Sequence, residues 1–176
     1  MTALTNHELR DEVEQAVKDC HIDRRGFHEV AKNQWLDLTT RMASAFTVWD
    51  GHRRPADDLH WVGYRLREPH WAFGPAYGPE IMSAVVTEPM VYLLIEDTFD
   101  KMWVYETAPD LIQVVLGELW GCDYLVVDKK LTWLMGEDHE SVVFACGDKA
   151  VTRLRQYVDT NKWERDPHTG EMRVAH

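Results

Sequence analysis

The chain has 176 residues, of which 45% are apolar and 28% charged, a balance typical of one globular domain and unlike that of disordered or fibrous proteins. Its formal net charge of −11 disfavours direct binding to a nucleic-acid backbone. No secretory leader or membrane span is evident, and three cysteines without metal-type spacing predict free thiols, so we expect a cytoplasmic protein that needs no membrane.

Two helices are predicted in the N-terminal part. Residues 5–20 combine a capping-box pair, Thr5 and Glu8, with an apolar stripe at helical spacing. Residues 24–35 predict a second, weaker helix. Residues 36–49 fit either a continuation of that helix through Met42 or a short extended segment.

The middle of the chain predicts loops around one strand. Residues 50–58 contain Asp50-Gly51 and Pro55, which favour a turn and oppose a helix. Residues 59–67 alternate as a strand does. Residues 68–80 hold three prolines and two glycines, which predicts a long irregular loop.

The C-terminal half predicts a sheet with one inserted and one final helix. Two strands form a hairpin, a helix begins near Pro109 and ends at Gly121, three more strands form a meander, and a helix follows Gly147-Asp148. The five strands are predicted at 90–97, 101–107, 123–127, 132–136 and 141–146.

The predicted fold class is α+β, with a central, mostly antiparallel sheet of five to six strands. It carries two N-terminal helices, one inserted helix and one C-terminal helix. Residues 1–160 are expected to form a single domain and residues 161–176 a loosely ordered polar tail. Two central strands are apolar on both faces, so helices or a second subunit should cover both sides, and a homodimer would satisfy this pattern.

The block Val127-Asp128-Lys129-Lys130, followed by Trp133-Leu134, Glu137 and His139, has the form VDKK..WL..E.H. With the hairpin and helix before it, residues 90–147 resemble a bacterial domain family of unknown function. That resemblance implies a strand pair, a helix and this block, and it brings no activity. The small acidic α+β layout is more loosely similar to SUKH-type immunity proteins, which neutralise secreted toxins, although their N-terminal motif is absent.

Negative charge is concentrated in residues 86–150, where 13 acids and 4 bases give −9. Such a surface attracts a basic protein and repels phosphate backbones. The leading hypothesis is a non-enzymatic acidic binding protein of immunity or inhibitor type, directed against a basic nuclease or other nucleic-acid-binding protein. The predicted partner-binding residues are Glu96, Asp97, Asp100, Trp103, Glu137, Asp138 and Glu140.

A second hypothesis uses residues 46–77, where aromatic and basic side chains alternate. Aromatic faces and guanidinium groups together can stack a base and hold a phosphate, so this segment is a candidate site for a nucleotide-like ligand. The same aromatics could instead pack the loop onto the sheet while the arginines pair with nearby acids. The candidate ligand-binding residues are Arg53, Arg54, Trp61, Tyr64, Arg65, Arg67 and Trp71.

A third hypothesis is a Cys-His enzyme. Cys122 begins a predicted strand, and His139, oriented by Asp123 or Asp138, would be its base. The competing interpretation, which we favour, makes residues 137–140 the exposed turn of a hairpin with its carboxylates in water. No metal-binding, phosphate-loop or nucleophile-elbow motif occurs, so neither a metal nor a cofactor is expected.

Overall fold

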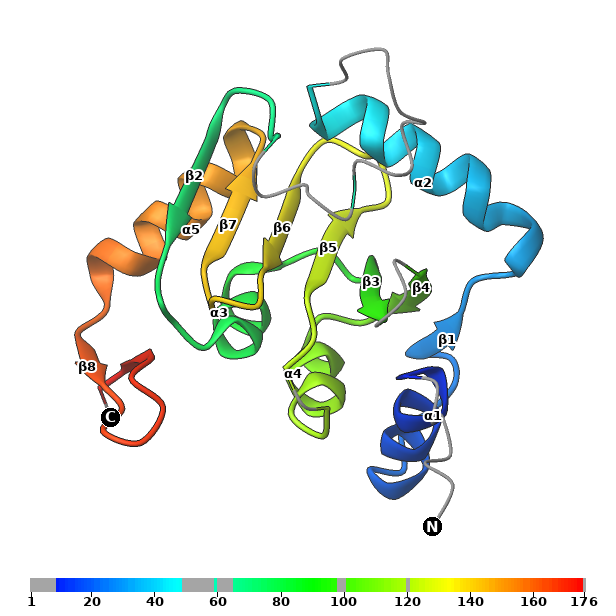
Figure 1. Ribbon diagram of the computed structural model, residues 1–176, viewed down its shortest axis with the longest axis horizontal. Helices are drawn as coiled ribbons and strands as arrows, with labels where there is room; N and C mark the ends of the chain where they lie inside the picture. Colours follow the sequence, from blue (N-terminus) through cyan, green and yellow to red (C-terminus); the bar gives the residue numbers. More distant parts are fainter. Residues whose placement is uncertain (1–8, 49–58, 60–64, 98–100, 120, 176) are drawn as a thin grey trace, which may run out of the picture.

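The computed structural model describes residues 9–48, 59, 65–97, 101–119 and 121–175 (Figure 1). Its five helices are α1 (Leu9–Asp19), α2 (Lys32–Phe46), α3 (Gly78–Val85), α4 (Asp110–Leu116) and α5 (Asp148–Thr160). The strands are β1 (Phe27–Glu29), β2 (His70–Phe73), β3 (Val91–Asp97), β4 (Lys101–Thr107), β5 (Tyr124–Asp128), β6 (Leu134–Glu137), β7 (Val143–Cys146), β8 (Trp163–Arg165) and β9 (Met172–Val174).

Seven strands form one antiparallel sheet in the order β1-β4-β3-β5-β6-β7-β2. The predicted hairpin of β3 and β4 is confirmed, with Val91 opposite Thr107 and Asp97 opposite Lys101. The meander of β5, β6 and β7 is confirmed as well. The α+β class is therefore correct, but the prediction of five to six strands is too low because β1 and β2 add one strand at each edge.

Helices cover both faces of the sheet, as the two-sided apolar strands predicted (Figure 1). Two consecutive residues of β3, Leu93 and Leu94, belong to two separate core clusters. One cluster also contains apolar side chains of α1, α3, α4 and α5, and the other those of α2. Burial on both sides explains why these strands lack the alternation of a half-exposed sheet.

The predicted helix over residues 24–35 is wrong. Phe27 to Glu29 pair with β4 as the edge strand β1, and the helix begins only at Lys32. Pairing with a strand distant in sequence outweighs a weak local helical pattern. From Lys32 onward the chain is helical through Phe46, which settles the ambiguity of residues 36–49.

Residues 68–80 are not an irregular loop throughout. Residues 70–73 form β2, which pairs with β7, and Gly78 starts α3 with Pro79 in its first turn. An edge strand tolerates prolines on either side because only one of its edges forms hydrogen bonds. Of the predicted strand 59–67, residues 60–64 lie outside the described residues, and Leu66 forms an isolated bridge with Thr47.

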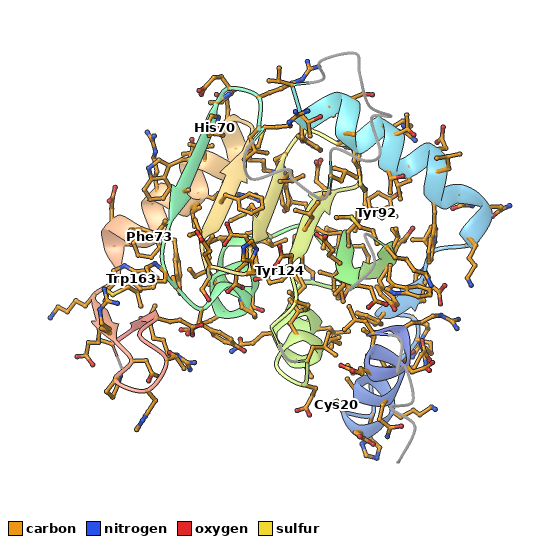
Figure 2. All side chains as sticks on the ribbon, in the orientation of Figure 1. Cys20, His70, Phe73, Tyr92, Tyr124 and Trp163 are labelled. Atoms are coloured by element: carbon orange, nitrogen blue, oxygen red, sulfur yellow. The ribbon has the colours of Figure 1, made fainter. Side chains whose placement is uncertain are left out.

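The C-terminal residues, predicted as a loosely ordered tail, contain the hairpin of β8 and β9. Trp163 packs against Phe73 of β2, with ring centroids 4.8 Å apart, and both are labelled in Figure 2. Met172 pairs with Ala76 just before α3, so the hairpin lies next to the α3 N-terminus. No helix of the described residues is long and apolar enough to cross a membrane.

Candidate functional site

One end of the sheet gathers carboxylates from three neighbouring strands. At this end β3 and β6 finish while β5 and β7 begin, and Tyr124 lies opposite both Ile95 and Glu137. We call this the acidic end, defined by the described acids Glu96, Asp97, Asp123, Glu137, Asp138 and Glu140. Asp100 lies outside the described residues.

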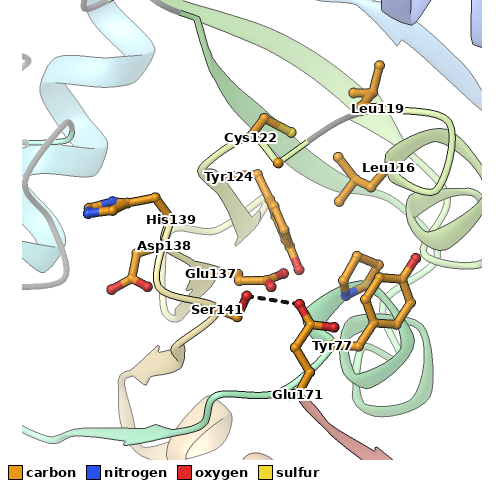
Figure 3. Close-up of a pocket in the computed structure, with 12 residues that line it drawn as sticks. Tyr77, Leu116, Leu119, Cys122, Tyr124, Glu137, Asp138, His139, Ser141 and Glu171 are labelled. Atoms are coloured by element: carbon orange, nitrogen blue, oxygen red, sulfur yellow. Dashed lines mark hydrogen bonds between the residues drawn. The ribbon is translucent and has the colours of Figure 1, made fainter. Parts of the chain in front are cut away.

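A pocket of about 190 Å³ opens at the acidic end (Figure 3). Its polar lining comes from the ends of β5 and β6, from the turn after β6, and from the segments before α3 and β9. Its apolar wall comes from α4 and the segment that follows it. The lining residues are Tyr77, Pro79, Leu116, Leu119, Gly121, Cys122, Tyr124, Glu137, Asp138, His139, Ser141 and Glu171.

The hairpin interpretation of residues 137–140 is correct for the turn but wrong for Glu137. Asp138 shapes the turn by accepting the backbone N–H groups of Glu140 and Val142, each at 3.0 Å. Glu137 instead ends β6, and its side chain enters the pocket, where burial raises its pKa to about 7. No described lysine or arginine forms a salt bridge with it.

Gly78 makes room for this arrangement. A Cβ atom at Gly78 would collide with the Glu137 carboxylate and with the Tyr124 hydroxyl. The Gly78 backbone N–H also faces the carboxylate and lowers its pKa, but this effect is smaller than that of burial. A glycine at the start of α3 is therefore part of the geometry that holds the Glu137 side chain in the pocket.

Tyr124 carries a buried hydroxyl that has no hydrogen-bond partner among the described residues. The residue is 2% exposed, and its hydroxyl lies beside the Glu137 carboxylate without making a well-oriented hydrogen bond. Burial raises the pKa of this phenol well above its ordinary value, so it stays neutral. Buried polar atoms are satisfied in most proteins, so each exception needs a reason.

The Glu171 carboxylate of the pocket already has two partners. Ser141 donates to Glu171 at 3.0 Å, the dashed line in Figure 3. The Arg173 guanidinium lies 3.6 Å from the other Glu171 oxygen and 4.7 Å from the centre of the Tyr77 ring. Of the three carboxylates of the pocket, Glu171 thus has a cation beside it, whereas Asp138 and Glu137 have none among the described lysines and arginines.

Cys122 and His139 both line the pocket but do not meet. The His139 ring points away from the Cys122 side chain (Figure 3), and its Nδ1 lies 3.4 Å from an Asp123 oxygen. That pairing raises the pKa of His139. Burial raises the pKa of Cys122 to about 12, whereas an activated nucleophile needs a lowered one. The Cys-His enzyme stays a hypothesis that these features do not favour.

Trp103 is not available as an exposed anchor. It is 1% exposed, its indole N–H donates to Asp97 at 3.0 Å, and the Lys101 ammonium lies 3.9 Å from its ring centre. Asp97 also accepts the backbone N–H of Leu9 at the start of α1. These two predicted partner-binding residues therefore attach α1 to the sheet.

A second hollow continues the acidic surface along α1. It has a volume of about 630 Å³ and is lined by residues of α1 and by Glu118, which follows the end of α4. Its charged lining is Asp11, Glu12, Glu14, Lys18, Asp19 and Glu118. We call this hollow the α1 groove; its Glu118 lies in the chain between Leu116 and Leu119, which form the wall of the pocket.

At the opposite end of the sheet, Asp128 and Glu88 have backbone N–H groups or cations as partners. Asp128 is 5% exposed and accepts backbone N–H groups from Lys130, Thr132 and Trp133 as well as the Thr132 hydroxyl. Glu88 accepts from Arg153 at 2.9 Å and pairs with Lys149. Burial alone would raise the pKa of Glu88, but these hydrogen bonds outweigh it and hold the pKa at about 2.

The candidate ligand site over residues 46–77 is only partly visible. Arg53, Arg54, Trp61 and Tyr64 lie outside the described residues. Arg67 donates to the Thr47 carbonyl at the end of α2, whereas Trp71 packs into the core cluster on the opposite face of the sheet. Arg65 precedes the bridge between Leu66 and Thr47. The structure therefore does not gather the described members into one site.

Sequence reasoning missed Tyr124, Ser141 and Glu171 as members of a site, and it placed Tyr77 only within the candidate nucleotide-binding segment 46–77. Pro79 was an available indication that a helix starts there, directly after Tyr77. Within the described residues, no three His, Cys, Asp or Glu side chains are placed so that they could hold one metal ion.

A comparison with models of protein families assigns the chain to a domain family. A model of DUF6756, a family of unknown function, matches residues 5–158, so the chain belongs to that family. The resemblance predicted over residues 90–147 is confirmed and extends to the N-terminal helices. The looser similarity to SUKH-type immunity proteins gains no support. Searches of curated proteins and of solved structures found no significant match.

Proposed function

We propose that this DUF6756 protein is a non-enzymatic acidic binding protein, of immunity or inhibitor type, whose partner is a basic nuclease or other nucleic-acid-binding protein. The carrying observation is the lack of a lysine or arginine partner for the acids at the end of β6 and in the turn that follows it. Glu137, Asp138 and Glu140 form no salt bridge with a lysine or arginine within the described part of the chain, and Asp123 pairs only with His139.

Charge complementarity would act first, during encounter. Opposed surface potentials steer association, and salt screens them with a Debye length of about 10 Å at 0.1 M. The α1 groove enlarges the surface beyond the sheet, because its lining has five acids and one lysine, although one of these acids, Glu14, is paired with Arg24. With Trp103 buried, the aromatic contacts of the proposed interface are the two tyrosines of the pocket, Tyr77 and Tyr124.

The test measures binding to a basic partner as a function of salt and of surface charge. Proteins retained from a bacterial lysate on the immobilised chain at low salt are identified, purified and titrated against the free chain. The charge-reversal variant Glu118→Lys/Glu140→Lys removes two exposed acids from the proposed surface. The matched control Asp159→Lys/Glu164→Lys changes the net charge equally at the exposed C-terminal end of α5 and on β8.

We expect the first variant to weaken binding by at least about tenfold, and the control by far less, because rim charges act mainly over short range. Affinity should fall as salt rises. Equal losses in both variants would mean that total charge alone is sensed. Retention of acidic proteins, or of none, would contradict the proposal.

A further inference from the structure

The pocket at the acidic end has the chemistry of a site for an organic cation. Among the described residues no lysine or arginine lines it, whereas three carboxylates and three hydroxyls do. Arg173, the nearest cation described above, is held outside the lining by Tyr77 and Glu171. The charge that would complement Glu137 is therefore missing from the described protein.

The buried Tyr124 hydroxyl is an independent observation that points to a ligand. It is directed into the pocket and lies beside the Glu137 carboxylate, whose pKa it lowers, but it makes no well-oriented hydrogen bond with any described residue. A ligand donor placed between the Glu137 carboxylate and this hydroxyl would satisfy both groups at once. Leaving them unsatisfied has a cost, which a site that is filled in its working state avoids.

Size and wall chemistry define the ligand further. A volume of about 190 Å³ is below the roughly 300–1,000 Å³ of sites for drug-sized molecules, so the pocket fits an end group with a short stem and not a nucleotide. Leu116 and Leu119 form an apolar wall suited to methylene groups. Tyrosine faces next to carboxylates are favourable surroundings for a cation.

We propose that this pocket binds a guanidinium or primary ammonium group at the end of a short alkyl chain, with the charged group on Glu137 and Tyr124 and the alkyl stem on Leu116 and Leu119. Two sources share this chemistry: a free small molecule, and the arginine or lysine side chain of a protein. In the second case the inference rests on the proposed function and identifies its anchor.

The test titrates the isotope-labelled full-length chain with n-butylguanidinium and n-butylammonium, up to about 50 mM as suits weak binding. Butyrate is the anionic control of equal length. Backbone amide shifts should change at Gly78, Gly121 and Glu137 with both cations and not with butyrate. Equal shifts with butyrate, or no saturable shifts with either cation, would overturn the proposal.

Two variants separate the pocket from general surface charge. Glu137→Gln removes the charge with nearly the same shape, and we expect the affinity for both cations to fall by about tenfold or more. Asp159→Asn removes an exposed charge outside the pocket and outside the acidic end, and the affinity should stay within about twofold of wild type. Equal losses would assign the binding to the surface field and contradict a pocket site. The amide spectrum of each variant verifies its fold.

Binding should also depend on pH through Glu137. A cation on this carboxylate favours its ionised form, so affinity should rise between pH 6 and 8 in wild type and stay flat in Glu137→Gln. The other groups facing the pocket are Tyr77, Tyr124, Asp138 and Glu171, with Arg173 behind Tyr77, the Cys122 thiol on the wall and the His139–Asp123 pair at its edge. His139→Asn should keep the rise. Loss of the rise in that variant would contradict the assignment to Glu137.

A blocked arginine peptide distinguishes the two sources. Acetyl-glycyl-arginyl-glycinamide binding at least as tightly as n-butylguanidinium supports a protein side chain, whereas exclusion of the peptide supports a free small molecule. Both results require the cation pocket. If small cations bind but no basic protein is retained, the proposed function is contradicted and the proposed cation site is still supported. If basic proteins bind equally well to Glu137→Gln, the pocket is not their anchor.

Discussion

Glu88 and Glu137 lie at opposite ends of one sheet, and both are partly buried, yet their carboxyl groups differ by about five pH units in pKa. The pKa of Glu88 is about 2 and that of Glu137 about 7. Burial raises both, but Lys149 and Arg153 donate hydrogen bonds to Glu88. Glu137 has no such cations in the described structure, so burial decides its pKa.

Asp128 extends the comparison to a carboxylate held by the backbone. It lies at the same end as Glu88, and four hydrogen bonds from the turn up to Trp133 satisfy its two oxygens. The partners available to a carboxylate therefore separate Glu88 and Asp128 from Glu137. Asp128 and Glu88 stabilise the fold through these hydrogen bonds, whereas the Glu137 carboxylate has no lysine or arginine partner among the described residues.

Removal of Asp128 should produce the largest effect. In Asp128→Ala the partly buried N–H of Thr132 and the buried N–H of Trp133 lose their acceptor, and each unsatisfied donor costs about 1–3 kcal/mol, so we expect a loss of about 3–4 kcal/mol. Urea unfolding at pH 7 measures it. A loss below about 1 kcal/mol would show that the turn does not depend on this carboxylate.

Glu137 should make the protein less stable as pH rises. Its folded-state pKa of about 7 exceeds the unfolded value near 4.5, so the folded state holds a proton that the unfolded state lacks between these values. This contribution is full below pH 4.5 and is lost through pH 7. We compare the free energy of unfolding of Glu137→Gln with that of wild type at each pH. From pH 4 to pH 8 this difference should change by about 2 kcal/mol in favour of the variant, a figure that allows for the partial exposure of Glu137. Parallel pH profiles for the two proteins would contradict an elevated pKa.

The fold was predictable where hydrophobic pattern and turn chemistry agree. The hairpin of β3 and β4, the meander and α5 follow from strong local signals. Strands β1 and β2 were missed because three or four residues at a sheet edge depend on pairing with β4 and β7. Local propensity contains little information about such pairing.

The candidate site was only partly predictable. The sequence indicated an acidic turn near His139, because charged residues between two apolar runs favour a hairpin tip. It did not indicate that Glu137 faces inward, since one residue decides which side of the strand a side chain occupies. Nor could spacing reveal that Tyr77 and Glu171, nearly a hundred residues apart, border the same pocket.

Glu88→Gln should have the opposite pH dependence and a smaller magnitude. The folded-state pKa of about 2 lies below the unfolded value near 4.5, so Glu88 stabilises the protein above pH 4.5 and the contribution disappears as pH falls toward 2. Because Lys149 is half exposed, we expect a loss of about 1–2 kcal/mol at pH 7. Unfolding at pH 7 and pH 3 tests this, and the difference from wild type must shrink at the lower pH. A difference that grows at pH 3 would contradict the lowered pKa of Glu88, and with it the contrast between Glu88 and Glu137.

Tyr124→Phe should have the smallest effect on stability, and its sign is informative. The variant keeps the ring and removes a buried hydroxyl without a partner in the described structure, so stability should stay equal or rise by about 0.5–1 kcal/mol. Tyr105→Phe is the matched control, because the Tyr105 hydroxyl is also buried without a partner but lies outside the pocket lining. Thermal unfolding should give similar shifts for both variants, whereas only Tyr124→Phe should weaken cation binding. A clear loss of stability confined to Tyr124→Phe would mean that its hydroxyl already serves the fold, and the contrast between the two ends would then rest on Glu137 alone.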